Sequence, residues 1–423
     1  MALPSVIQID PLTGPVQAEI TVPGSKSITN RALILAALNE GVTTLRGALW
    51  SEDTQVMVDC LDRLGVAVEV APDPGEPANR TMTVRGRGLQ GVNGGAAGAP
   101  LELFVGNAGT AARFLMALVA LGRGSFRLAG VPRMHERPQV ALFDALRGLG
   151  YRVDSPNGRL PAVVQGGGPR PGECRVSVAE SSQFASALLL GAAAGGWRVS
   201  IEDENPEELP YVMMTERLIS AFPRGGGVFQ VEPDASSGSY FWGLNALPLP
   251  GEGSRVSVAH WPDTGWQHDE AFPRFLPLPA TVSRRNDLAD SIMTAIVLAP
   301  LAGHPVRFTE LGRLRLQECE RVVALRTELM KCGAGVVEVG DTLEVRPSRL
   351  HGADIETYND HRMAMCFAIL GLKVPGLRLQ NPACVKKTFP NFFQKLAGAG
   401  GLGVTVRDAE TGRVLDGEDL QAR

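Results

Sequence analysis

The chain has 423 residues, of which 44% are hydrophobic, and a formal net charge of −4 at pH 7. This length exceeds what one ordinary hydrophobic core organises, so we expect two domains of roughly 200 residues each. Because no block of like charges occurs, the basic stripe of a nucleic-acid-binding protein is excluded, and nucleic acid is not an expected partner.

Two kinds of predicted helix alternate along the chain. One kind is amphipathic and leads through Gly into a Val-containing strand. It occurs in residues 56–70, 141–153 and 322–339. The other kind is rich in small residues and apolar on every side, which is typical of a buried helix. It occurs in residues 32–38, 111–121, 186–194, 292–301 and 363–370.

A buried helix, a strand, an amphipathic helix and another strand thus recur roughly six times. The repeat predicts an α/β fold with two similar domains, each built from three units whose buried helices point inward. Neither half shows strict βαβ alternation with a Gly-rich nucleotide turn, so a doubly wound sheet is less favoured. Pro248, Pro250 and Pro273 interrupt the fourth unit, where we expect shortened helices.

A polar segment precedes each inner helix of this repeat. Gly lets the backbone approach a ligand, Ser, Thr and Asn donate hydrogen bonds, and first-turn N–H groups favour an anion. For any single segment, ordinary helix capping explains the same residue types. The six segments are 24–31, 106–113, 179–184, 233–241, 286–291 and 358–362.

Capping does not require the basic residues that accompany most of these segments. Arg offers a planar fork that matches phosphate and carboxylate, and Lys is a point charge and possible proton donor. Together they predict a site for a multiply charged anion. The basic residues are Lys26, Arg31, Arg113, Arg133, Arg321, Arg362 and Lys387.

Two acidic residues, Asp290 and Glu318, stand among these cations. A carboxylate opposes anion binding unless it has a task such as taking a proton from a hydroxyl group. The simpler alternatives are an N-cap for Asp290 and a helix-dipole partner for Glu318.

The cysteines and histidines indicate neither disulfides nor metal binding. The six residues of each type are scattered, without a CxxC pair or zinc-ligand spacing. No apolar stretch reaches the roughly 18 residues of a membrane span, and the N-terminal sequence lacks the pattern of an export signal. We therefore expect a soluble, cytoplasmic chain with reduced thiols, no metal and no membrane partner.

Seven stretches occur in an order and spacing that resemble the 5-enolpyruvylshikimate-3-phosphate synthase family of enolpyruvyl transferases. The resemblance covers nearly the whole chain, and its first and sixth motifs are the most specific. The stretches are PGSKSITNRALILAAL, GNAGTAAR, PRMHERP, SSQF, DASSGSYF, YNDHRMAMCFAI and KKTFPNFF.

The resemblance implies transfer of the enolpyruvyl group of phosphoenolpyruvate to the 5-hydroxyl of shikimate 3-phosphate, with release of phosphate, in aromatic amino acid biosynthesis. It implies two domains of three βαβαββ units with helices packed inside, like an inside-out barrel. The domains would be residues 22–233, mainly for shikimate 3-phosphate, and residues 1–21 plus 234–423, with the active site in the cleft between them. It also implies a monomer without cofactors, and glyphosate as an inhibitor.

The same resemblance assigns roles to individual residues. Asp290 would be the base at the shikimate hydroxyl and Glu318 a proton shuttle at the methylene carbon. The four catalytic residues would be Lys26, Asp290, Glu318 and Lys387. Lys26, Ser27, Arg31, Asn107, Ser181, Ser182 and Gln183 would bind substrate, with Ser181 and Ser182 at the shikimate-side phosphate. Gly109, Arg133, Arg321, Arg362 and Lys387 would form the phosphoenolpyruvate pocket.

Three residues depart from the family pattern. Gln317 stands where Lys is usual, Glu208 falls near a usual phosphate-binding Ser, and Phe114 replaces a common Pro. Phe114 either reorients its helix, which would alter sensitivity to glyphosate, or is simply repacked. Gln317 and Glu208 give some weight to a binding-only relative without turnover. The transferase that acts on UDP-N-acetylglucosamine is the other alternative, but it uses a loop Cys that no motif here matches.

Overall fold

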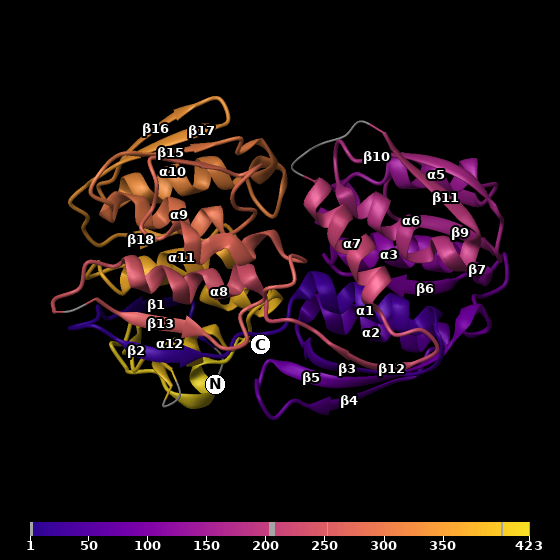
Figure 1. Cartoon of the computed structure of the whole chain (residues 1–423), viewed down its shortest axis with the longest axis horizontal. Coiled ribbons are helices and arrows are strands. Elements are labelled where there is room, and N and C mark those ends of the chain that lie inside the picture. The colour runs from indigo at the N-terminus through magenta and orange to yellow at the C-terminus, as the bar shows by residue number, and fades with distance from the viewer. Residues whose placement is uncertain (1–2, 203–207, 252, 399–400, 423) are drawn as a thin grey trace. The chain divides into compact units, whose positions relative to one another are not determined.

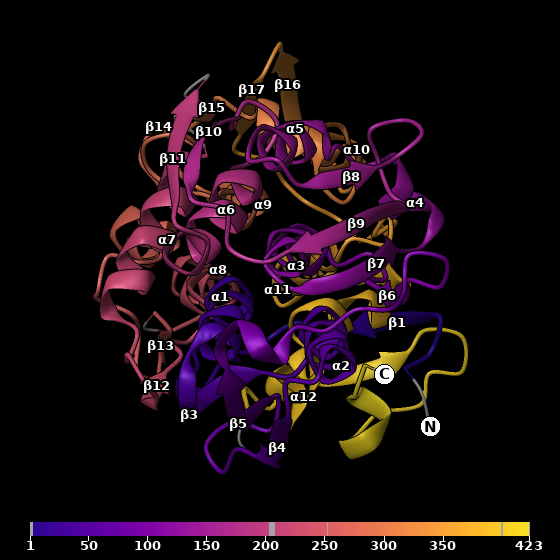
Figure 2. The same ribbon diagram turned by 90° about the vertical axis from the view of Figure 1, so that its right-hand side faces the viewer.

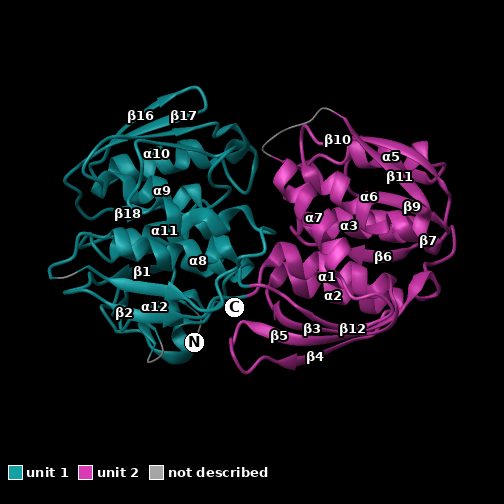
Figure 3. Ribbon diagram, viewed as in Figure 1, with its two compact units in different colours: residues 1–23, 233–423 teal, residues 24–232 magenta. Residues whose placement is uncertain are grey.

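The computed structural model describes residues 3–202, 208–251, 253–398 and 401–422. The chain forms two compact units, residues 24–232 and residues 1–23 with 233–423 (Figure 3). The bounds expected from the sequence, 22–233 and 1–21 plus 234–423, lie within two residues of these at each crossing. The chain therefore leaves the unit that contains its two termini after Pro23 and returns to it at Pro233.

Within its described residues, the unit of residues 24–232 contains seven α-helices and ten strands. Figure 1 labels most of them. Its helices are α1 (Lys26–Leu38), α2 (Glu52–Leu64), α3 (Gly109–Ala120), α4 (Pro132–Glu136), α5 (Val140–Gly148), α6 (Ser182–Gly195) and α7 (Leu209–Ala221), with the 3-10 helix η1 (Gly88–Gly91). Its strands are β3 (Glu40–Leu49), β4 (Val68–Pro72), β5 (Asn79–Arg87), β6 (Leu101–Phe104), β7 (Arg123–Ala129), β8 (Arg152–Asp154), β9 (Ala162–Gly167), β10 (Gly172–Ser177), β11 (Trp197–Glu202) and β12 (Gly227–Gln230).

The other unit begins with β1 (Val6–Ile9) and β2 (Gln17–Ile20) and resumes after Pro233. Its α-helices are α8 (Ala235–Gly243), α9 (Ile292–Leu298), α10 (Arg321–Lys331), α11 (His361–Gly371) and α12 (Phe392–Ala397). Its 3-10 helices are η2 (Leu244–Ala246), η3 (His268–Phe275), η4 (Ala299–Leu301), η5 (Gly312–Leu316), η6 (Pro382–Lys387) and η7 (Gly417–Leu420). Its later strands are β13 (Arg255–Val258), β14 (Thr281–Ser283), β15 (Val306–Thr309), β16 (Gly335–Val339), β17 (Thr342–Arg346), β18 (Asp354–Ile355), β19 (Arg378–Gln380) and β20 (Val406–Asp408).

Within the described residues, each unit has two four-stranded sheets and one pair of strands. Every four-stranded sheet has a parallel pair followed by two antiparallel neighbours. Their strand orders are β12-β3-β5-β4, β6-β7-β9-β8, β14-β15-β17-β16 and β18-β19-β1-β20. The remaining pairs, β10-β11 and β13-β2, are parallel.

The predicted α/β fold is confirmed, but two of its six units are shorter than expected. As far as the structure describes them, the unit of β10, α6, β11 and α7 and the unit of β2, α8, β13 and η3 lack the final pair of strands. In both cases the next strand follows too soon for a hairpin. It begins at Gly227 after α7 ends at Ala221, and at Thr281 after η3 ends at Phe275. These two strands, β12 and β14, are edge strands of two of the four-stranded sheets.

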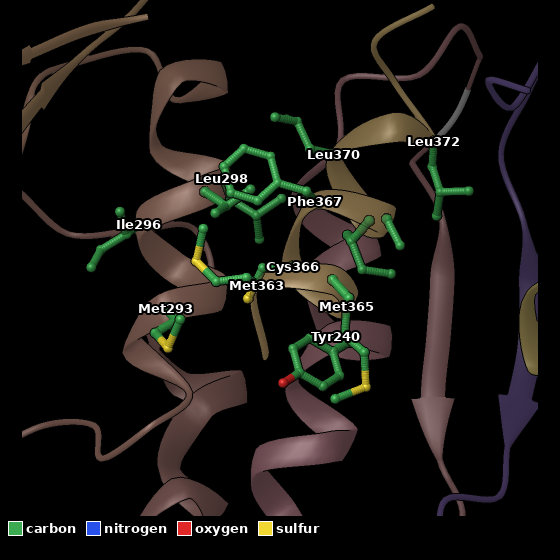
Figure 4. Packing of buried hydrophobic residues seen from close by; sticks show 14 of the residues in the cluster. Tyr240, Met293, Ile296, Leu298, Met363, Met365, Cys366, Phe367, Leu370 and Leu372 are labelled. Carbon is green, nitrogen blue, oxygen red and sulfur yellow. The ribbon is translucent and has the colours of Figure 1, made fainter. Parts of the chain in front are cut away.

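The inner helices contact one another within each unit. They are α1, α3 and α6 in residues 24–232, and α8, α9 and α11 in the other unit (Figure 2). Every residue of α3 and of α9 is buried, so helices without a polar face are confirmed as core elements. Figure 4 shows Tyr240, Met293 and Phe367 packed in one such core.

The irregular fourth repeat has the shortened helices that its prolines predict. Helix α8 stops at Gly243, before Pro248, and the segment around Pro273 forms the 3-10 helix η3 instead of an α-helix. In the described part of the chain, no helix is both long and apolar enough to cross a lipid bilayer.

Gly24, the first residue of its unit, has no room for a side chain. A Cβ there would lie 1.9 Å from the carbonyl oxygen of Gly47 and 3.1 Å from Cγ1 of Val231. Because the nearest atom belongs to the backbone of β3, it cannot rotate away. We expect Gly24→Ala to lower the free energy of unfolding by about 3 kcal/mol, measured by denaturant titration. Gly14→Ala, where no atom lies within 4 Å, is the matched control and should be neutral. Equal midpoints for the two variants would contradict the prediction.

Candidate active site

The inner helices begin in two different ways. Four have side-chain acceptors at their N-termini, so the capping alternative holds for them. Ser181 caps α6, Asp234 caps α8 and Asp360 caps α11, while Asp269 accepts from the N–H of Ser291 just before α9. In the part of the chain that the structure describes, Ser25 before α1 and Ala108 before α3 make no capping hydrogen bond, and neither first turn is acidic. These two helix ends fit the expected anion site best.

Lys26 is the first residue of α1 and forms an ion pair with α2. Its Nζ lies 2.9 Å from Oδ2 of Asp53, and its side chain is 19% exposed. Asp53 is buried near the N-terminus of α2. The ammonium group is therefore held in place while part of it remains open to a ligand.

Arg31 is buried and makes hydrogen bonds within its own unit. Its guanidinium donates to Thr215 Oγ1 at 2.7 Å, to Ser186 Oγ at 3.1 Å and to the carbonyl of Ser27 at 2.9 Å. Burial lowers the pKa of Arg31 to about 10, so the group stays charged at neutral pH. Arg31 thus joins α1 to α6 and α7, and its expected contact with substrate gains no support from these bonds.

Phe114 packs against the same guanidinium. The centre of its ring lies 5.2 Å from Cζ of Arg31, and Phe114 is buried inside an unbroken α3. The cation–π contact is worth about 1 kcal/mol or more when buried. This geometry favours repacking over a change in helix direction, and altered glyphosate sensitivity remains a prediction.

Two further arginines lie beside the open end of α3. A Cβ on Gly109 would stand 2.4 Å from Nη1 of Arg113 and 2.8 Å from both terminal nitrogens of Arg137. Arg137 also donates to the carbonyl of Asn107 at 3.3 Å, and Oδ1 of Asn107 is buried without a hydrogen-bond partner among the described residues. Gly109 therefore leaves room for two guanidinium groups at a helix N-terminus.

The structure does not bring Arg133 to this cluster. Arg133 is 55% exposed and forms an ion pair with Glu136, three residues further along α4. Arg137, which the sequence reasoning missed, follows directly after α4 and has extended backbone angles of φ −75° and ψ 143°. The second arginine of PRMHERP is therefore the one that lies beside Gly109.

Gln183 and its neighbours connect α6 to this cluster. Oε1 of Gln183 accepts from Nη1 of Arg113 at 3.1 Å. Ser181 and Ser182 lie at the start of α6, both buried. The N–H of Ser182 donates to Oε2 of Glu208 at 2.6 Å, so a carboxylate lies at the N-terminus of this helix.

A second cluster lies in the other unit and centres on Asp290. Its carboxylate accepts from Arg284 at 3.2 Å and lies 3.1 Å from Arg362 and 3.8 Å from Arg321. Burial raises the pKa of Asp290, but Arg362, Arg321 and Arg284 outweigh this effect and hold the pKa well below its ordinary value. Asp290 is therefore ionised, and an N-cap role does not account for its partners.

Glu318 lies between two cations of the same cluster. Its Oε2 accepts from Arg321 at 2.8 Å and its Oε1 from Lys387 at 3.1 Å. The two side chains of the Glu318–Lys387 pair are 21% and 14% exposed. Arg321 is held from behind by Asp360, with bonds of 2.7 and 3.2 Å. Four of the predicted site residues, Asp290, Glu318, Arg321 and Lys387, thus form one connected network.

Arg362 completes this cluster at the start of α11. Besides Asp290, it reaches the hydroxyl of Tyr240 at 3.5 Å. Burial lowers the pKa of Arg362, but Asp290 and Tyr240 outweigh burial, and the pKa lies well above its ordinary value. The cluster therefore combines fixed positive charge with two carboxylates that can accept protons.

Gln317 bonds to both sides of the network. Its Nε2 donates to Asp290 at 3.2 Å, and its Oε1 accepts from Arg321. A Lys in this position could donate to Asp290 but could not accept from Arg321. The neutral amide thus orients the carboxylate of Asp290 and the guanidinium of Arg321 at once.

We expect Gln317→Lys to lower turnover by roughly tenfold, because the lysine would repel Arg321 and remove its acceptor. Steady-state kcat and KM for each substrate would measure the effect. Gln317→Glu should retain the bond to Arg321 but lose the donor to Asp290. Full activity of the Lys variant would show that the double contact is unimportant.

The fold and these clusters, with carboxylates held among fixed cations, are typical of an enzyme whose substrates are small polyanions. The family model described as EPSP synthase (3-phosphoshikimate 1-carboxyvinyltransferase) matches residues 12–225 and 279–396. The chain belongs to the EPSP synthase family.

Named relatives match over nearly their full length. A 3-phosphoshikimate 1-carboxyvinyltransferase of Opitutus terrae is 40% identical, covering 94% of this chain and 98% of the relative. The enzyme of the same name from Trichormus variabilis is 36% identical, covering 92% and 98%. A solved EPSP synthase from Acinetobacter baumannii aligns with a TM-score of 0.76 at 22% identity, covering 95% of this chain and 100% of that one. The structural match supports the fold.

Proposed function

We propose that this chain transfers the enolpyruvyl group of phosphoenolpyruvate to the 5-hydroxyl of shikimate 3-phosphate and releases phosphate. The observation that carries the proposal is the network in which Asp290 and Glu318 lie among Arg321, Arg362 and Lys387. A protein that only bound anions would gain nothing from two carboxylates in contact with its cations. The names of the relatives point to the same reaction.

The reaction has an addition step and an elimination step, and each needs two proton transfers. In the addition step, Asp290 removes the hydroxyl proton, the oxygen bonds to C2 of phosphoenolpyruvate, and C3 gains a proton from the Glu318–Lys387 pair. In the elimination step, the same pair takes a proton back from the methyl group, the bond between C2 and the phosphate oxygen breaks and the double bond returns, while the departing phosphate takes up the proton held by Asp290. Fixed cations stabilise the phosphate as it leaves.

The charge balance at Asp290 suggests how substrate makes it a better base. Arg321 and Arg362 lower its pKa in the ligand-free protein. When the carboxylate and phosphate of phosphoenolpyruvate bind these guanidinium groups, less positive charge acts on Asp290 and its pKa rises. Proton removal from the acceptor is thereby favoured once the donor substrate is present.

Residues of the other unit hold the remaining charges in this proposal. Lys26 contacts both substrates, and the open end of α3 with Gly109, Asn107 and Arg137 binds phosphoenolpyruvate. Arg137 takes the place first given to Arg133, because it lies beside Gly109. Ser27 and Gln183 bind shikimate 3-phosphate with Ser181 and Ser182. Arg31 supports the helix that carries Lys26 and Ser27.

Phosphate release distinguishes the three candidate functions. Purified protein is mixed with phosphoenolpyruvate and either shikimate 3-phosphate or UDP-N-acetylglucosamine. Release with shikimate 3-phosphate alone supports the proposal, release with the nucleotide sugar favours the related transferase, and release with neither favours a binding-only protein. Lys26→Met should abolish release and keep the circular dichroism spectrum, whereas Lys373→Met on the surface serves as the control.

We further propose that the enzyme acts in the cytoplasm as a monomer that needs no cofactor. The proposed location in the cytoplasm, where thiols stay reduced, is supported by six free cysteines, five of which are buried. The oligomeric state can be measured by light scattering on the full chain.

A further inference from the structure

The carboxylate of Glu208 occupies the N-terminus of α6. Glu208 is 3% exposed and immediately precedes α7. Its Oε2 accepts a 2.6 Å hydrogen bond from the N–H of Ser182, the first residue of α6. The next N–H, that of Gln183, donates to Ser181 Oγ at 3.3 Å. The first two N–H groups of α6 are therefore both engaged, one of them by a buried negative charge.

We propose that Glu208 competes with the phosphate of the acceptor substrate for this end of α6. This inference rests on the proposed function, in which Ser181 and Ser182 bind that phosphate. One first-turn N–H cannot serve two anions, and like charges repel strongly where water is excluded. The phosphate gains the N–H of Ser182 only when the carboxylate releases it. Glu208 thus sets the affinity for a phosphorylated acceptor relative to one without phosphate.

Other contacts hold α7 in place without Glu208. Thr215 of α7 accepts from Nε of Arg31 at 2.7 Å and shares a 2.8 Å hydrogen bond with Ser186 of α6. Both bonds are buried and lie nearly two turns further along the helix. A substitution at Glu208 therefore changes the charge at the end of α6 while the packing of α1, α6 and α7 persists.

Glu208→Gln tests this role, because the amide oxygen can still accept from Ser182 but carries no charge. The full chain and the variant are titrated calorimetrically with shikimate 3-phosphate and with shikimate, and assayed with saturating phosphoenolpyruvate. We expect Kd and KM for shikimate 3-phosphate to fall at least about tenfold, while Kd for shikimate and kcat change less than about twofold. Glu216→Gln, which is exposed on the same helix, should match the wild type.

A Kd for shikimate 3-phosphate that is unchanged or weaker in Glu208→Gln overturns the proposal. So does an equal gain in affinity for shikimate, because the effect would then not involve phosphate. If the Gln variant does not fold, Glu208→Ser must give the same tightening. If the wild-type protein released no phosphate from phosphoenolpyruvate with shikimate 3-phosphate, the proposed function would be overturned. The Kd comparison would still decide the role of Glu208.

Discussion

Replacing Asp290 by Asn is expected to lower kcat by roughly a hundred- to ten-thousandfold, the range typical for loss of a general base. The amide can still accept from Arg284, but it cannot take a proton from the substrate hydroxyl. KM for phosphoenolpyruvate should rise less than kcat falls, because Arg321 and Arg362 remain. Phosphate release under steady-state and single-turnover conditions would separate the two effects.

The same substitution has a predicted pH signature in stability. The pKa of Asp290 is lower in the folded protein than in the unfolded chain, because three guanidinium groups stabilise its charge. Its contribution to stability is therefore present above the unfolded pKa and is lost as the pH falls through the folded pKa. Wild type should be more stable than Asp290→Asn at neutral pH, and the difference should narrow only in strong acid.

A surface carboxylate provides the matched control. Asp354 forms an ion pair with Arg378 in which both side chains are nearly half exposed, and such pairs contribute little. Asp354→Asn should keep both activity and stability near wild type. If Asp290→Asn retained a wild-type kcat, a base elsewhere would have to be sought.

Much of the fold follows from periodicity in the sequence. Helices such as residues 111–121 are apolar on every side, and such a pattern leaves burial as the stable arrangement. Their polar N-termini can be read directly in the sequence, and a buried helix needs such residues to satisfy its first N–H groups. The completion of sheets by distant strands was not predictable, because β12 pairs with β3 across more than one hundred residues of chain.

The charged partners were harder to predict than the helices. Whether a capping segment binds its own side chain or leaves its N–H groups open depends on local angles, and α6 and α1 differ in this respect. Arg31 belongs to the same sequence motif as Lys26, five residues further along the helix, but its side chain is buried in the core. Spacing alone did not reveal that Glu208 would reach Ser182.

The two arginines of PRMHERP show why spacing can mislead. In a continuous helix, residues four apart lie on one face. Here α4 ends at Glu136, and Arg137 turns away in an extended conformation. Arg133 therefore remains on the surface while the guanidinium of Arg137 lies beside Gly109. Pro138 is the local signal that distinguishes the two, because the residue before a proline is shifted from the helical to the extended region.

We therefore expect Arg137→Ala to raise KM for phosphoenolpyruvate by roughly a hundredfold, since a charged hydrogen-bonding group would be lost from the site. Arg133→Ala is the matched variant four residues earlier and should change KM less than about twofold, because its ion pair is exposed. Arg137→Lys should recover only part of the loss, since Lys lacks the planar fork. A larger effect at Arg133 than at Arg137 would restore the original assignment and place the anion away from Gly109.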